Sequence, residues 1–326
     1  MTSQPAAVIL MYHRVAEVTV DPWGLCVSPG NFSTQLEACR RVGTPISLQD
    51  FVHLSPSDLP ARSVIVTFDD GYLDNLEQAL PLLEAHSVPA TVFVATGNID
   101  TDREFWWDEL ESILLVPGRL PDRLDLKVDD DVLSWQLGEA AEVTADELLA
   151  EGDTRPWSAE QGTRLRLFSD IWSALWPLKA AERRVALDAL AEWAGTAPSH
   201  DPTRRTMFSG EIRAMARGGL VSIGAHTVDH PPLPAHPQSE QLWQIRESKR
   251  VLEELIGTDV DTFAYPHGEY SSDTVDLVRQ VGFRCAVTVG HEPVGEITDP
   301  MLLPRYGVKN VAGDVLAGQL DAWFAS

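Results

Sequence analysis

The sequence predicts an α/β protein in which parallel strands alternate with crossover helices. Short apolar runs rich in β-branched residues recur along the chain, and segments of helical periodicity separate them. The composition, 44% hydrophobic and 23% charged, is that of a globular protein with a substantial core. This alternation is typical of a sheet whose faces are covered by helices. We expect a single domain of residues 1–326, with a mostly helical insertion at about 101–205.

Seven strands are expected, because seven short apolar runs are bounded by turn-forming or helical segments. Continuous apolar character is typical of strands buried on both faces, as in parallel sheets. The predicted strands are Ala7–His13, Ser63–Phe68, Ala90–Ala95, Leu220–Ala225, Thr262–Tyr265, Arg284–Val289 and Leu302–Val308.

Helices between these strands are predicted from apolar stripes and from residues typical of helix ends. Pro81 is expected to kink the first helix or to mark the start of its second half. The second helix should end at Gly257, and the third should begin at a Ser N-cap and stop at Gly282. These helices are predicted over Leu73–Leu83, Leu242–Leu255 and Ser272–Val281.

The insertion interrupts the strand and helix series, which resumes immediately after it. Helical patterns occur around Leu165–Trp176 and Ala180–Trp193. The tryptophans at 135, 157, 172, 176 and 193 are expected to pack inside this segment rather than to bind ligand.

Charge argues against several partners. The chain has 25 Lys and Arg against 49 Asp and Glu, giving a net charge of −24. Phosphate backbones and anionic membranes are repelled by such a surface, so we expect no nucleic-acid partner. No apolar run approaches the roughly 20 residues needed to span a bilayer. Because Met1–Ala6 lacks a basic leader segment and the three cysteines are scattered, we expect a cytoplasmic protein without disulfides.

Two adjacent carboxylates, Asp69 and Asp70, directly follow the strand Ser63–Phe68. Ligands of parallel α/β folds bind at the carboxyl ends of strands. Neighbouring carboxylates are electrostatically unfavourable there unless a cation neutralises one of them. The alternative is a surface turn in which Asp70 caps the next helix.

Two histidines, His226 and His230, follow the strand Leu220–Ala225 in the same way, and prolines come directly after them. Together with Asp70 they would supply the three protein ligands of an open catalytic metal site. The same set also suits ferrous oxygenases. Those enzymes would have no use for Asp69, whereas hydrolysis needs a base to remove a proton from water.

A third segment, Tyr265-Pro266-His267-Gly268, follows the strand Thr262–Tyr265. Proline fixes the backbone and glycine permits a tight turn, so the N–H of His267 could point at a developing oxyanion. A structural turn would explain the motif equally well.

Together these segments resemble the NodB-homology polysaccharide deacetylases, carbohydrate esterase family 4. The Thr-Phe-Asp-Asp-Gly and His-Thr-x-x-His motifs in this order are specific when taken jointly. The resemblance implies an irregular (β/α)7-type, TIM-barrel-like fold and removal of an acyl group, usually N-acetyl from an amino sugar. It rests on Leu10–Val15, Val66–Gly71 with Tyr72, Asp74 and Asn75, Ala90–Val94, Gly224–His230, Phe263–Gly268 and Leu303–Arg305.

The resemblance also implies roles for matching residues. Asp69 corresponds to the general base, and Asp70, His226 and His230 correspond to the ligands of a divalent metal. Zn²⁺ is the expected ion, with Co²⁺ or Ni²⁺ as alternatives. The backbone N–H of His267 corresponds to the oxyanion donor.

Two departures from the family pattern direct attention to other residues. Ala264 stands where the third motif commonly carries an arginine that pairs with the base, so Arg305 is the candidate partner of Asp69. The final motif's histidine is not plainly present, and His291 is the nearest substitute for a general acid.

Further residues are expected to contact substrate. His13 ends the first strand and should face the same mouth, beside Tyr265, Pro266 and His267. Trp106 and Trp107 offer flat faces that suit sugar rings, although anchoring the insertion to the barrel is the favoured interpretation of both.

The expected substrate is an acylated amino sugar or a saccharide that contains one, within the cell. A deformylase or an amidase of a small metabolite would share every ligand and differ in its pocket. A catalytically silent sugar-binding protein is the alternative from another class, and the four intact residues 69, 70, 226 and 230 argue against it.

Overall fold

The computed structural model describes residues 7–55, 58–128, 131–150, 154–196, 201–295 and 298–326. The chain divides into two compact units. Unit 1 comprises Met1–Glu17, Leu25–Thr101 and Thr206–Ser326, and unit 2 comprises Val18–Gly24 and Asp102–Arg205. In the described part of the chain, no helix has the length and apolar character needed to cross a membrane.

Unit 1 is built on a parallel sheet of seven strands in the order β13-β12-β11-β6-β5-β1-β14, and the short strand β4 also pairs with β5. Each of the seven expected strands is present, most of them shorter than predicted by one or more residues. The strands are β1 (Ala7–Tyr12), β4 (Thr44–Pro45), β5 (Ser63–Phe68), β6 (Ala90–Val94), β11 (Val221–Ala225), β12 (Thr262–Ala264), β13 (Cys285–Val287) and β14 (Tyr306–Gly307).

The two ends of this sheet approach each other through the segment before β14. Val287 and Leu303 form an isolated parallel bridge, and the N–H of Gly290 donates to the carbonyl of Arg305 at 3.1 Å. The predicted barrel-like (β/α)7 fold is thereby confirmed. The last strand is shorter than Leu302–Val308 because Pro304 has no N–H to donate to a ladder.

Side chains alternate between the interior of this barrel and its helix-covered outside. Ile9, Ile65 and Phe93 belong to the interior cluster, whereas their strand neighbours pack outward against the helices. Gly224 is required opposite Phe93, because a Cβ at 224 would lie 2.4 Å from the Phe93 ring. The same alternation places Thr67 and Asp69 on the interior face with Ile65.

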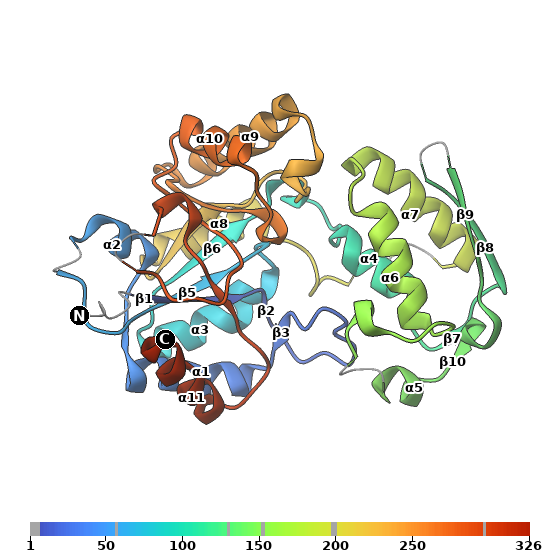
Figure 1. The fold of residues 1–326 in the computed structure, drawn as a ribbon, viewed down its shortest axis with the longest axis horizontal. Helices are drawn as coiled ribbons and strands as arrows, with labels where there is room; N and C mark the ends of the chain where they lie inside the picture. The colour runs from blue at the N-terminus through green and yellow to red at the C-terminus, as the bar shows by residue number, and fades with distance from the viewer. Residues whose placement is uncertain (1–6, 56–57, 129–130, 151–153, 197–200, 296–297) are drawn as a thin grey trace. The chain divides into compact units, whose positions relative to one another are not determined.

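The helices of unit 1 cover the outside of the sheet (Figure 1). The first predicted helix is a π-helical turn, Asn75–Ala79, followed by α3 with Pro81 in its first turn. Gly257 and Gly282 end their helices in the left-handed conformation, as expected. Helices α1 and α11 pack against each other. The helices are α1 (Pro29–Val42), α2 (Leu48–His53), α3 (Leu80–His86), α8 (Ser209–Arg217), α9 (Gln238–Ile256), α10 (Ser272–Val281) and α11 (Gly313–Ala325).

A short parallel pair, β2 (Arg14–Val15) with β3 (Cys26–Val27), completes the strands of unit 1. It flanks the segment Val18–Gly24, which belongs to unit 2. Cys26, Cys39 and Cys285 are buried, and none of the three is part of a disulfide bond.

In the described residues of unit 2, four α-helices occur with two antiparallel strand pairs, which the sequence did not predict. In the β8–β9 hairpin, Leu124 and Leu126 face inward while the intervening charged residues face solvent. The elements are α4 (Trp106–Leu114), α5 (Ala145–Ala150), α6 (Arg164–Leu175), α7 (Ala180–Ala194), β7 (Gly118–Arg119), β8 (Arg123–Val128), β9 (Asp131–Gln136) and β10 (Glu142–Val143).

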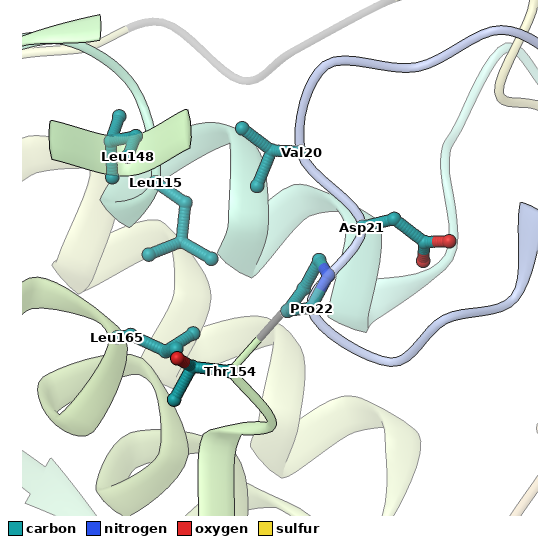
Figure 2. Close-up of a pocket in the computed structure, with 7 residues that line it drawn as sticks. All are labelled: Val20, Asp21, Pro22, Leu115, Leu148, Thr154 and Leu165. Carbon is teal, nitrogen blue, oxygen red and sulfur yellow. The ribbon is translucent and has the colours of Figure 1, made fainter. Parts of the chain in front are cut away.

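Unit 2 has its own apolar core and a row of contacting tryptophans. The rings of Trp23 and Trp172 pack against each other, with 4.7 Å between their centroids. This contact explains why the segment Val18–Gly24 joins unit 2. A small pocket lies beside this segment (Figure 2). It is mostly apolar and brings together no group of metal ligands or catalytic side chains. The residues that line it are Val20, Asp21, Pro22, Leu115, Leu148, Thr154 and Leu165.

Candidate active site

The two adjacent carboxylates at the end of β5 point to different partners. Asp70 adopts a left-handed backbone conformation with φ of 73°, and Gly71 follows with φ of 81°. This sharp turn directs Asp69 toward Arg305 and Asp70 toward His226 and His230. Both carboxylates are buried, with 3% and 2% of their surface exposed. The turn therefore separates two charges that are adjacent in sequence.

Asp70, His226 and His230 converge on one point. Their ligand atoms all lie within 4.8 Å of one another, and the three form a potential metal-binding group within the described residues. The Nε2 atoms of His226 and His230 lie 3.7 and 3.5 Å from Oδ1 of Asp70. Donor atoms placed about 2.1 Å from a shared centre at tetrahedral angles lie roughly 3.4 Å apart. The spacing is therefore that of a metal site.

The second nitrogen of His226 fixes which way its ring faces. Nδ1 donates to the carbonyl of Ala264 at 2.8 Å, which leaves the Nε2 lone pair facing Asp70. Metal-ligating histidines usually make such a bond with their outer nitrogen. Burial lowers the pKa of His226, so the neutral imidazole that ligation requires is favoured. Two imidazoles and one carboxylate thus fit a divalent ion in both donor type and orientation.

Asp69 is held in a bidentate ion pair. The two terminal nitrogens of Arg305 donate to its two oxygens at 2.7 Å each, and Arg305 is fully buried. Arg305 also donates to Thr67 and to the carbonyl of Thr288. Burial by itself would raise the pKa of Asp69, but the Arg305 guanidinium and His226 outweigh it and lower this pKa to about 2. Asp69 is therefore an anion at neutral pH.

His13 and His267 flank the cluster. His13 follows β1. Burial lowers its pKa to about 4, although the nearby negative charge of Asp69 by itself would raise this pKa. The ring of His267 lies 4.4 Å from that of His230 between centroids. His267 has a positive φ of 59° inside the short turn Pro266–Gly268. Both predicted substrate contacts thus lie beside the three-ligand group.

Other predicted site residues lie elsewhere. Tyr265 packs in the outer core against Phe263 at 5.3 Å, because it alternates with Ala264, which faces the barrel interior. His291 is exposed, and its ring lies 6.2 Å from Tyr306 rather than against Asp69. The structure brings neither side chain to the ligand group.

Trp106 and Trp107 belong to unit 2, where both rings are engaged in packing. Trp106 stacks on Trp172 at 5.7 Å, and Arg183 lies over its ring at 5.0 Å. Trp107 stacks on Phe105 at 4.6 Å.

One site residue was missed by sequence reasoning. Gln244 of α9 contacts the backbone of the loop that joins His226 to His230. Its only sequence signal is a polar residue beside the buried Ile245 on an otherwise regular helix. That signal does not say which loop the side chain would meet.

Curated proteins of similar sequence match part of this chain. The chitooligosaccharide deacetylase of Azorhizobium caulinodans is 29% identical over 96 residues, which are 29% of this chain and 42% of that protein. The matched segments span less than half the length of the curated relatives.

Solved structures of low sequence identity share the fold. The Streptococcus pyogenes deacetylase PplD, solved with acetate, matches with a TM-score of 0.58 and 18% identity, over 96% of this chain and 97% of that one. IcaB from Ammonifex degensii matches with a TM-score of 0.56 and 18% identity, over 99% and 98% of the two chains.

The family model named polysaccharide deacetylase matches residues 57–116 and 181–286, which together make up more than half of the sequence. These ranges include Asp69, Asp70, His226 and His230, the residues that converge in the barrel. On this match the chain belongs to the polysaccharide deacetylase family.

Proposed function

We propose that this protein is a metal-dependent hydrolase that removes an acyl group, most often N-acetyl, from an amino-sugar-containing saccharide. The observation that carries the proposal is the convergence of Asp70, His226 and His230 beside a second carboxylate that is kept charged. A purely structural barrel would have no need for a buried, ionised Asp69 next to three metal-ligand side chains. Membership of a family of deacetylases supports the same reaction class.

The residues divide the chemistry between them. A divalent ion held by Asp70, His226 and His230 would polarise the acyl carbonyl and make water acidic. Asp69 accepts the proton of the attacking water as general base, and Arg305 orients its carboxylate. The N–H of His267 is the proposed donor to the developing oxyanion. His291 stays a prediction as the acid that protonates the leaving amine.

Zn²⁺ is the proposed ion. Two imidazole nitrogens and one carboxylate oxygen are the ligand set of open catalytic zinc sites. Co²⁺ and Ni²⁺ are the alternative ions, because imidazole ligands also suit divalent ions of this part of the first transition series.

The substrate class is proposed from the family and from one relative. The family acts on acetylated saccharides, and the Azorhizobium relative is named for chitooligosaccharides. An acylated amino sugar, free or within an oligosaccharide, is therefore the substrate to test first.

The test is a screen of acylated mono- and oligosaccharides in which released acetate or formate is measured with and without added Zn²⁺. Asp69→Asn should keep the ion but lower turnover by about two orders of magnitude or more, because no base remains. Asp74→Asn is the matched control, since Asp74 is also buried but pairs with Arg14 rather than with Arg305.

Two results would contradict the proposal. If Asp69→Asn were as active as the parent, Asp69 would not be the base. If the protein bound no divalent ion and released no acyl group, the silent sugar-binding alternative would stand. Release of formate alone, or from small amides alone, would favour the deformylase or amidase alternative.

A further inference from the structure

The loop from His226 to His230 carries both proposed histidine ligands, and its own hydrogen bonds do not fix its position in the fold. Thr227 and His230 both adopt positive φ, at 65° and 52°. Each such residue costs about 1–3 kcal/mol unless surrounding contacts fix it. The threonine hydroxyl accepts from the N–H of His230 at 3.1 Å, which closes the loop but does not anchor it to the rest of the fold. Something outside the loop must therefore set its position.

One side of the loop is anchored by the segment after β6. The N–H of Thr96 donates to the carbonyl of Thr227 at 3.1 Å, and the N–H of Gly97 donates to that of Val228 at 2.8 Å. These bonds occupy two carbonyls of the loop. They leave the N–H groups of Val228 and Asp229 to be bonded by another element.

Gln244 of helix α9 bonds these two N–H groups. Its Oε1 accepts from the N–H of Val228 at 3.0 Å and from the N–H of Asp229 at 2.9 Å. Its Nε2 donates to Oδ2 of Asp229 at 2.8 Å. Gln244 is buried, with 2% of its surface exposed, whereas Val228 and Asp229 are half-buried, so water reaches these bonds only in part. An amide is needed here, because the same side chain must accept from the backbone and donate to a carboxylate.

We propose that Gln244 is a positioning residue that fixes the separation and direction of the two histidine ligands. This inference rests on the proposed metal site. Gln244 touches neither histidine side chain nor the reacting atoms. It acts by holding residues 228 and 229, the turn between the histidines, against helix α9. Loosening that turn lets the two imidazoles move apart and weakens ion binding.

The test variant is Gln244→Glu, which keeps the length of the side chain and its acceptor for the two N–H groups. It replaces the donor by a second carboxylate oxygen facing Asp229, so the turn is pushed away from α9. Loss of a side chain that hydrogen-bonds a metal ligand directly typically lowers metal affinity about 10- to 100-fold. Gln244 acts through the backbone between the two histidines, so we expect a drop in Zn²⁺ affinity near the lower end of that range, about 10-fold, measured by competition with a chromophoric chelator.

The matched control is Gln241→Glu, one helical turn earlier on α9. Gln241 is also buried, but its amide donates to the carbonyl of His236 and its oxygen accepts from Thr274. The control should lower the unfolding midpoint of the metal-free protein by an amount similar to that in Gln244→Glu. Its Zn²⁺ affinity should stay within about twofold of the parent value. Absorption of the Co²⁺-loaded proteins gives a second readout, because only Gln244→Glu should change the spectrum.

A second variant makes the proposal independent of folding losses. Adding Asp229→Asn to Gln244→Glu reverses the donor and the acceptor, so the new amide donates to the new carboxylate. Zn²⁺ affinity should return to within about threefold of the parent value. Asp229→Asn alone should bind nearly as the parent does, because the new amide can turn its oxygen toward Gln244.

The outcomes separate the two proposals. If the parent binds Zn²⁺ and His226→Ala abolishes binding, but Gln244→Glu binds like the parent or loses no more than Gln241→Glu, the positioning role is refuted while the site stands. A double variant as weak as Gln244→Glu would also refute it. If His226→Ala and the parent bind Zn²⁺ equally, the proposed site fails and the inference fails with it.

Discussion

The pairing of Asp69 with Arg305 makes a prediction about the sign of a pH dependence. In the folded protein the pKa of Asp69 is lowered to about 2, against an ordinary value of 3.8. The unfolded chain therefore binds more protons than the folded one between these two values. Stability due to this group is fully present above about pH 4 and is lost as the pH falls toward 2. A shift of nearly two units corresponds to roughly 2 kcal/mol.

Arg305→Met should reverse the direction in which the Asp69 contribution to stability changes with pH. Without the guanidinium, burial dominates and raises the pKa of Asp69 above its ordinary value, so the folded protein binds more protons than the unfolded one. The variant should then gain stability on acidification through its raised pKa. Removing one partner of a buried pair should also cost about 3–5 kcal/mol at neutral pH, and less when Asp69→Asn is combined with it.

The assay is urea unfolding of chelator-treated protein between pH 2.5 and 7, so that bound metal does not contribute. Parent, Arg305→Met, Asp69→Asn and the double variant are compared at each pH. Asp69→Asn should lack the acid loss of roughly 2 kcal/mol that the parent shows. If Arg305→Met lost stability on acidification as steeply as the parent, the reasoning from the ion pair would be refuted.

Two further predictions follow from buried groups in the barrel. Gly224→Ala should lower the free energy of unfolding by about 1–3 kcal/mol, since its Cβ would lie 2.4 Å from the Phe93 ring; thermal unfolding that matches the parent would contradict this close approach. His13→Gln should reduce the loss of stability as the pH falls from about 6.5 to 4. The pKa of His13 is lowered to about 4 in the folded protein, so in this pH range the unfolded chain binds a proton that the folded chain does not. An unchanged dependence of stability on pH would contradict this prediction.

The barrel strands were predictable because their signal is local. Continuous apolar runs such as Ser63–Phe68 and Ala90–Val94 identify buried parallel strands without knowledge of their neighbours. The ends of these runs then located Asp69, Asp70, His226 and His230, since polar residues cannot continue a buried strand without partners. Strand ends therefore indicated both the fold and the candidate ligands.

Contacts between segments distant in sequence were not predictable in the same way. Nothing in the stretch Val18–Gly24 itself indicates which part of the chain it joins, yet it belongs to unit 2 through Trp23. The face toward which the Tyr265 side chain points depends on how side chains alternate along β12. A strand of three residues is too short for the sequence to show that alternation clearly. The bonds of Gln244 to the histidine loop exist only once α9 is packed on the sheet.

Arg305 comes from the closing segment of the barrel, 236 residues after the carboxylate that it neutralises. A ribosome must therefore add a further 236 residues after Asp69 before this carboxylate can acquire its counter-ion. Until the segment around Arg305 docks, Asp69 lacks the Arg305 guanidinium, and its carboxylate must stay hydrated or take up a proton. Deleting residues 300–326 would thus remove the counter-ion of Asp69 together with strand β14 and helix α11, although Asp70, His226 and His230 would remain.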